Sequence, residues 1–171
     1  MSEDSFVSFA YGSNMPVARL RERCPSARAI GIAELPGHEL RWHKRSSDGS
    51  GKCDVVASAD PDASVFGVLY EIALREKAAL DRAEGLGAGY EEIEIEVRCG
   101  GSPVVAKAYL ATDTDSALRP YTWYRALVVA GAKEHGLPAH YVERLESVPA
   151  NEDENQARHD ERMALIAEVR A

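Results

Sequence analysis

Hydrophobic and polar residues alternate along much of the middle of the chain. The clearest run is 91–97, in which Ile93, Ile95 and Val97 are separated by glutamates. Successive side chains of a strand point to opposite faces, so this run predicts one apolar face against a core and one acidic face in water. We assign no chemistry to these glutamates. Similar apolar or alternating runs, separated by turn-forming residues, predict strands at 5–11, 27–33, 39–43, 53–59, 65–72, 90–99 and 103–112.

Helical spacing of apolar residues appears between and after these strands. A helix over 74–83 runs into Glu84 and ends at Gly85, and Gly136 ends a longer one. After the acidic stretch 151–155, the apolar spacing is weak, which predicts a final helix that docks only loosely. The expected helices are a short one over 16–24, then 74–83, an αα-hairpin formed by 121–135 and a helix opened by Pro138, and a last one carrying Met163, Ile166 and Val169.

This order of elements predicts a mixed α/β (α+β) protein. A chain of 171 residues with 45% hydrophobic content can bury one sizeable core and is short for two. We therefore expect a single domain over 1–150, followed by an acidic tail and a short C-terminal helix over 151–171.

The charge balance and the cysteines narrow the class of protein. A net charge of −8 repels nucleic acids and acidic lipid surfaces, so neither is an expected partner. Apolar stretches fall far short of the ~20 residues that span a bilayer, and the first residues carry no basic signal region. Three widely spaced cysteines without a CxxC pair are typical of a reducing compartment. These features predict a cytoplasmic protein.

Several kinds of reactive site find no support in the spacing of residues. His38, His43, Asp60 and Asp62 lack the tight clustering of metal ligands, so we predict no metal site. The segment 49–52 lacks the glycine spacing of a phosphate-binding loop and is interpreted as an exposed flexible loop. No serine or cysteine stands in the context of an activated nucleophile.

Two features remain as candidates for chemistry. Glu84 ends an apolar-faced helix and leads into a glycine-rich loop, and Gly12, Ser13 and Asn14 form a turn where the first strand ends. Each has an ordinary alternative: Glu84 as an exposed residue at a helix end, and the turn as a simple helix cap.

Five segments, taken in order, resemble the gamma-glutamylcyclotransferase family. The first, 9–15, resembles its FAYGSN(L/M) signature, and 80–85 resembles its LDxxEG motif. Segment 131–138 is similar to its GAKExGLP helix end, and 65–71 and 108–110 resemble two of its strands. The likeness extends from Phe9 to about Val148, nearly the whole chain short of the acidic tail.

The resemblance implies a fold, a site and an assembly. The fold is a small closed or nearly closed β-barrel with flanking helices and a C-terminal helical hairpin, without metal or organic cofactor, and often dimeric. The family's catalytic glutamate falls on Glu84. Its substrate-binding residues fall on Ser8, Phe9, Ala10, Tyr11, Gly12, Ser13, Asn14, Tyr90, Tyr109 and Tyr124.

The activity that the resemblance implies is ring closure of a gamma-glutamyl amino acid or dipeptide to 5-oxoproline, with Glu84 as base. Backbone N–H groups at Gly12 and Ser13, aided by the positive end of the following helix, would stabilise the oxyanion. The alternatives are a cyclotransferase for gamma-glutamyl amines or for a carrier-linked gamma-glutamyl group, a non-catalytic binding module on the same fold, and an interaction protein that docks through its tail.

Overall fold

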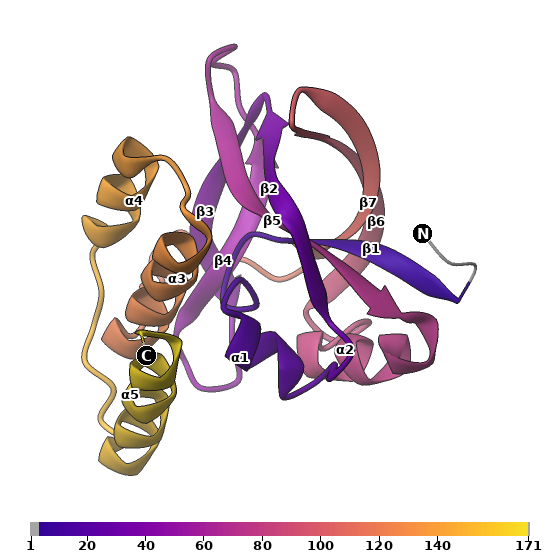
Figure 1. Ribbon diagram of the computed structural model, residues 1–171. Coiled ribbons are helices and arrows are strands. Elements are labelled where there is room, and N and C mark those ends of the chain that lie inside the picture. The colour runs from indigo at the N-terminus through magenta and orange to yellow at the C-terminus, as the bar shows by residue number, and fades with distance from the viewer. Residues whose placement is uncertain (1–3, 171) are drawn as a thin grey trace.

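Five strands close into a barrel in the order β1-β5-β2-β6-β7 in the computed structural model, which describes residues 4–170 (Figure 1). The predicted mixed α/β fold with a closed barrel is therefore confirmed. The strands are β1 Ser5–Ala10, β2 Arg28–Pro36, β3 His38–Arg45, β4 Gly51–Ala57, β5 Ser64–Ala73, β6 Tyr90–Cys99 and β7 Ser102–Ala111. The helices are α1 Val17–Arg21, α2 Lys77–Glu84, α3 Thr122–His135, α4 Ala139–Glu146 and α5 Gln156–Arg170, with a 3₁₀ turn over Leu74–Glu76.

The barrel closes where its first strand meets its last. β1 runs antiparallel to β5 along its whole length, from Ser5 opposite Ala73 to Ala10 opposite Val68. On its other side it pairs in parallel with β7, at Ser8 opposite Lys107. The end of β1, and the turn that follows it, are therefore fixed by strands that come much later in the chain.

Strands β3 and β4 form a separate two-stranded sheet beside the barrel. The predicted exposed loop at 49–52 is wrong for its second half, because Gly51 already begins β4 and Ser50 is only 2% exposed. Asp48 explains this order: it accepts hydrogen bonds from the Ser50 amide and hydroxyl, at 3.0 and 2.5 Å, and pairs with Lys52 at 3.3 Å.

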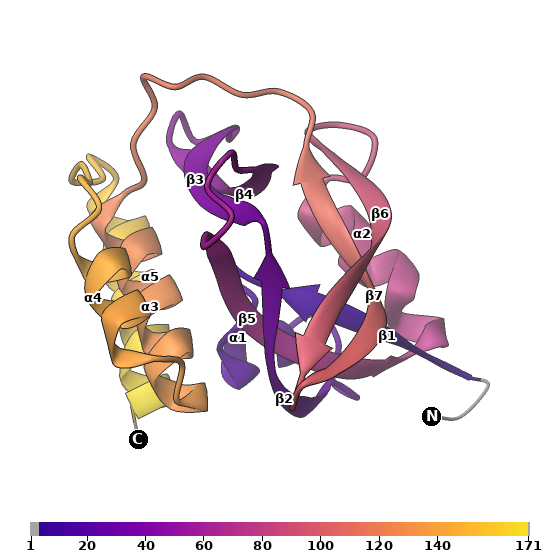
Figure 2. The same cartoon turned by 90° about the horizontal axis from the view of Figure 1, so that it is seen from above.

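Helices α3, α4 and α5 lie together on one side of the barrel, as Figure 2 shows from above. Leu165 and Ile166 of α5 pack against Leu127 and Ala130 of α3 in a buried apolar cluster. The predicted loose docking of the last helix is therefore wrong. No helix within residues 4–170 is long and apolar enough to cross a membrane.

One carboxylate of the acidic tail holds this helix layer together. Asp153 is 6% exposed and accepts a hydrogen bond from the indole N–H of Trp123 at 2.8 Å. It also accepts two bonds from Arg158 of α5, at 2.5 and 2.7 Å. These contacts hold the pKa of Asp153 well below its usual range. The order of the tail therefore comes from one paired charge, whereas Glu152 and Glu154 are exposed.

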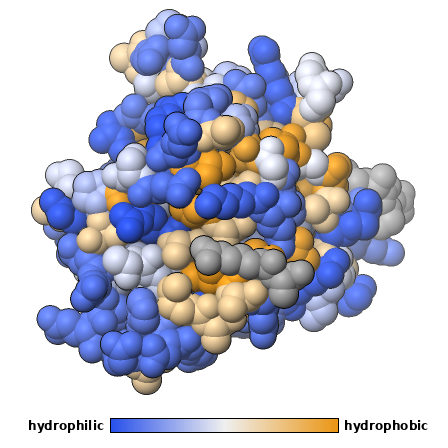
Figure 3. Space-filling model, turned by 60° about the vertical axis from the view of Figure 1, so that its left-hand side comes forward, coloured by the Kyte–Doolittle hydropathy of each residue, from blue (hydrophilic) through white to orange (hydrophobic). Residues whose placement is uncertain are grey.

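The outer surface agrees with the charge balance of the sequence. In the view of Figure 3, hydrophilic residues cover most of the visible face, and apolar residues form smaller patches between them. Because most apolar side chains are buried in the barrel and under the helices, the chemistry is expected in a cavity.

Candidate active site

A cavity of ≈ 160 Å³ opens beside the end of β1. Its walls come from the turn after β1, from α1, from the sheet of β3 and β4, from the end of α2, and from β6, β7 and α3. Every residue that the sequence assigned to the site lines this cavity, although the eleven positions span more than a hundred residues of chain. They are Ser8, Phe9, Ala10, Tyr11, Gly12, Ser13, Asn14, Glu84, Tyr90, Tyr109 and Tyr124.

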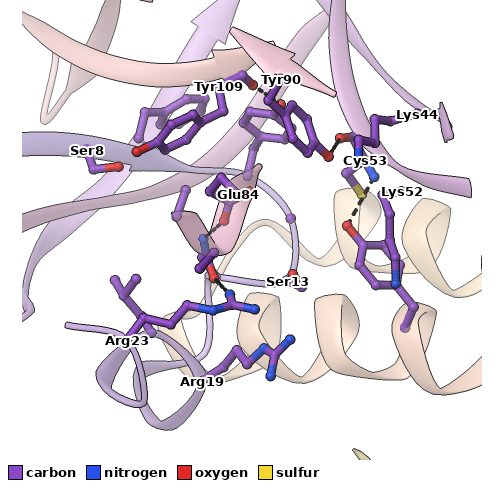
Figure 4. A pocket seen from close by; sticks show the side chains of 18 of the residues that line it. Ser8, Ser13, Arg19, Arg23, Lys44, Lys52, Cys53, Glu84, Tyr90 and Tyr109 are labelled. Carbon is purple, nitrogen blue, oxygen red and sulfur yellow. Dashed lines mark hydrogen bonds between the residues drawn. The ribbon is translucent and has the colours of Figure 1, made fainter. Parts of the chain in front are cut away.

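Glu84 reaches the cavity because α2 ends there. Leu80, one turn earlier, is 1% exposed and fixes the helix on the core, and Gly85 then ends the helix in the left-handed conformation at φ 70°. The side-chain amide of Asn14 donates a hydrogen bond to the Glu84 carboxylate, and Arg23 donates to the amide oxygen of Asn14 at 2.5 Å (Figure 4). Asn14 thus orients the carboxylate and links it to a positive charge.

The environment of Glu84 raises its pKa above the ordinary value. Burial is the main cause, because a carboxylate in a partly apolar wall loses its hydration. The positive charge of Arg23 and the hydrogen bond from Asn14 oppose this effect without cancelling it. A carboxylate shifted toward neutral pH is suited to take up a proton and to give it back.

The turn after β1 is held in place by contacts from β5 and from the end of α3. The carbonyl of Met15 accepts hydrogen bonds from the Tyr70 hydroxyl at 2.6 Å and from His135 at 2.8 Å. Glu134 accepts the N–H of Val17 at 2.9 Å. The strand at 65–71 and the helix end at 131–138, which resembled family motifs, therefore support the turn of the 9–15 motif rather than line the site.

Two backbone donors in this turn are free to bind a ligand. Within residues 4–170, neither the amide N–H of Gly12 nor that of Ser13 has a hydrogen-bond acceptor. The helix that follows the turn, α1, has five residues, and Glu134 already accepts its first N–H, so its dipole contributes little. Oxyanion binding would therefore depend on the two amides themselves.

Three tyrosine hydroxyls already donate their protons to the protein. Tyr11 donates to the backbone carbonyl of Tyr109, Tyr90 donates to the carbonyl of Cys53 at 2.9 Å, and Tyr109 donates to Asp81 at 2.5 Å. Toward a ligand these hydroxyls can only accept. Burial raises the pKa of each of the three, so they remain neutral phenols.

Tyr124 and Cys53 form the wall on the side of β4. The Tyr124 hydroxyl accepts the N–H of Cys53 at 3.0 Å. Burial raises the pKa of the Cys53 thiol to about 12, which leaves almost no thiolate at neutral pH. This residue is therefore a poor nucleophile. Within the described part of the chain, no three His, Cys, Asp or Glu side chains are grouped so that they could hold a metal ion.

Sequence reasoning missed the basic part of the cavity. Arg19 and Arg23 stand one helical turn apart just after the glycine turn, a signal that could have been found. Lys44 and Lys52 could not, because only the pairing of β3 with β4 brings them to the cavity. The missed lining residues are Arg19, Leu20, Arg23, Lys44, Ser46, Lys52, Cys53 and Ala83.

The sequence is similar to those of characterised proteins. Residues 64–145 match the AIG2-like family. The human protein named gamma-glutamylcyclotransferase is 33% identical over 156 residues, which cover 88% of this chain and 82% of the human protein. The mouse protein of the same name is also 33% identical, with 87% of this chain and 81% of its own length covered.

The fold is shared with solved structures. A structure named gamma-glutamyl cyclotransferase superposes with a TM-score of 0.84 at 30% identity, covering 96% of this chain and 99% of that one. YkqA from Bacillus subtilis superposes with a TM-score of 0.74 over 87% of this chain and 57% of its own, and at 22% identity it shows the fold alone.

Proposed function

This chain belongs to the gamma-glutamylcyclotransferase family, and we propose that it converts a gamma-glutamyl amino acid or dipeptide to 5-oxoproline and the free amino acid or peptide. The observation that supports this most is the placement of one carboxylate with a raised pKa, Glu84, beside two free amides, those of Gly12 and Ser13, in a single cavity.

The proposed reaction begins with proton removal. The substrate's α-ammonium cannot attack until a base takes a proton, and among residues 4–170 Glu84 is the one carboxylate that lines the cavity. The free amine then forms a C–N bond to the γ-carbonyl carbon of the same molecule, which closes a five-membered ring. Because both reacting groups belong to one molecule, a wall that holds the glutamyl part bent brings them together without a second encounter.

The tetrahedral intermediate then collapses. The amides of Gly12 and Ser13 donate hydrogen bonds to its oxyanion, the former carbonyl oxygen, which now carries a negative charge. The γ-amide C–N bond breaks, and protonated Glu84 returns its proton to the departing nitrogen. The ring nitrogen loses its second proton as the lactam forms, and the departing amine takes up this proton and leaves as an ammonium. Glu84 ends as it began, and neither water nor an enzyme nucleophile is consumed.

The direct test is 5-oxoproline release, measured by mass spectrometry, from gamma-glutamyl amino acids, a gamma-glutamyl dipeptide and gamma-glutamyl amines. We expect product from the amino acid and dipeptide substrates without added metal. Product from the amines alone would replace this proposal by the amine-specific alternative. No product from any substrate, despite measurable binding, would favour the non-catalytic module.

The pH dependence gives a second expected result. Activity should fall as the pH is lowered through the pKa of Glu84, because only its ionised form accepts a proton. That midpoint should lie above the ordinary glutamate value of about 4.3, since burial raises this pKa. Initial kcat/KM values between about pH 4 and 8 would locate the midpoint. A flat profile over that range would exclude Glu84 as the titrating base.

A further inference from the structure

The cavity is strongly basic although the protein is acidic. Arg19, Arg23, Lys44 and Lys52 line it, and Glu84 is the only carboxylate among the lining residues. Two of these cations contact residues already assigned to the site. Arg23 is bonded to Asn14, and Lys44 lies over the ring of Tyr90, 4.7 Å from its centroid. Arg19 and Lys52 remain to be explained.

Arg19 is a buried cation with an unused donor. The residue is 9% exposed, and its one ion pair is a 3.3 Å contact with Glu22, which is itself half in solvent. Its Nε is buried and has no hydrogen-bond partner within residues 4–170. Arg19 lines the cavity, and a buried guanidinium is costly unless its donors are paired, so this residue points to an anionic ligand.

Lys52 is a second cation close to the first. It pairs with Asp48 and lies over the rings of Trp123 and Tyr124, at 4.4 and 4.3 Å from their centroids. Burial is the main cause that lowers the pKa of Lys52 to about 8; Asp48 opposes this shift, and the charges of Arg19 and Arg162 add to it. The guanidinium of Arg162, in α5, lies over the ring of Trp123. Its Nε also lacks a partner among the described residues. A bound anion would relieve this repulsion.

We infer that Arg19 and Lys52 form a subsite for a carboxylate on the leaving part of the substrate. This inference rests on the proposed function. In Figure 4, Tyr109 and Lys52 lie on opposite sides of Glu84 and Ser13. With the reacting carbonyl at the amides of Gly12 and Ser13, the glutamyl part occupies the side of Tyr109. The leaving amino acid then extends toward Lys52 and Arg19.

Three substrates that differ at one group test this assignment. Gamma-glutamyl-alanine carries the carboxylate, its carboxamide is nearly isosteric but neutral, and gamma-glutamyl-ethylamine lacks the group. We expect the native protein to prefer the acid over both by about tenfold or more in kcat/KM, the ratio expected for one charged hydrogen-bonded contact. Arg19→Gln and Lys52→Gln should each lower kcat/KM for the acid about tenfold more than for the carboxamide.

Two further variants separate recognition from structural damage. Arg19→Lys keeps the charge and should retain most of the preference for the acid. Arg28→Gln removes an exposed arginine that pairs with Glu71 on the barrel surface, and should leave all three rates unchanged. The thermal unfolding midpoint of each variant shows whether it is folded.

The outcomes distinguish this inference from the proposed function. Equal losses on all three substrates in folded Arg19→Gln and Lys52→Gln would overturn the inference, because the two residues would then act on the shared glutamyl part. Equal turnover of the three substrates by the native protein would also overturn it, while the proposed function stood. Absence of 5-oxoproline from all three would reject the proposed function and this inference with it.

Discussion

Glu84→Gln is expected to lower the rate of 5-oxoproline release by about 10²- to 10⁴-fold, the usual contribution of a positioned general base. Gln has the size of Glu and can still accept the hydrogen bond from Asn14, so the cavity keeps its shape while its base is lost. The measurement is single-substrate kinetics on the native protein and the variant at the same pH. The acid limb of the native pH profile should disappear in the variant.

The same substitution should not destabilise the fold. The pKa of Glu84 is raised in the folded protein, so the folded state binds its proton more readily than the unfolded state. The stability that this group contributes is present below its unfolded pKa and is lost as the pH rises through its folded pKa. Near neutral pH the ionised side chain is therefore a cost that Gln removes. The unfolding midpoint of the variant should equal or exceed that of the native protein.

An exposed glutamate provides the control for this variant. Glu94 of β6 has a 70% exposed side chain, and Glu94→Gln changes the same chemical group far from the cavity. Glu94→Gln should change neither the rate of 5-oxoproline release nor the acid limb of the pH profile. Near-native activity in Glu84→Gln would remove Glu84 as the base, and an equal loss in Glu94→Gln would show that the effect is not local.

Gly131→Ala is expected to destabilise the protein by about 1–3 kcal/mol, the range for overpacking a tight contact. A methyl group at this position would lie 2.6 Å from Cδ of Pro16 and 2.7 Å from Cβ of Met15. For a chain of this size the unfolding midpoint should fall by about 2–4 °C per kcal/mol. Activity should fall as well, since the displaced residues directly follow the turn that carries the two free amides.

The sign of the stability change in Gly131→Ala identifies its cause. In an ordinary helix interior, Gly→Ala stabilises by roughly 0.5–1 kcal/mol, so a loss of stability can be assigned to the close approach of α3 to the turn. Gly31→Ala in β2 is a control for adding a methyl group away from the turn, because this methyl would meet only the thiol of Cys99, at 3.2 Å, and activity should be retained. A raised midpoint in Gly131→Ala would mean that the turn is not pressed against the helix.

The strands and the helix ends could be predicted because local patterns carry them. Alternation located β6 at its observed bounds, and glycines marked the ends of α2 and α3. Glu84 and the turn at 12–14 were predictable only through the family resemblance, since a glutamate at a helix end and a glycine turn are common features. The predicted dimer and the division of the chain at residue 150 remain predictions.

The wrong predictions concern segments whose structure depends on pairing with distant parts of the chain. Ser50 is polar and flanked by glycines, which predicts a loop, but the next residue, Gly51, pairs with Arg45 of β3 and donates its N–H to the carbonyl of Arg119 at 2.9 Å. Leu165 and Ile166 give a weak helical pattern, yet α3 offers them Leu127 as a partner. The basic end of the cavity depends on how β3 and β4 pair, and no local pattern contains that information.

The parallel pairing of β1 with β7 at Ser8, which closes the barrel, also constrains the order in which the protein folds. β1 is made early, but its partners in the barrel begin at Ser64 and Ser102. Contacts so distant in sequence form slowly, because the intervening chain loses its freedom before they contribute. During synthesis β1 can pair with β5 first, but its other edge must wait unpaired until β7 has left the ribosome. Catalytic competence would be acquired late in folding, and the exposed edge of β1 would be the segment most in need of protection from aggregation until then.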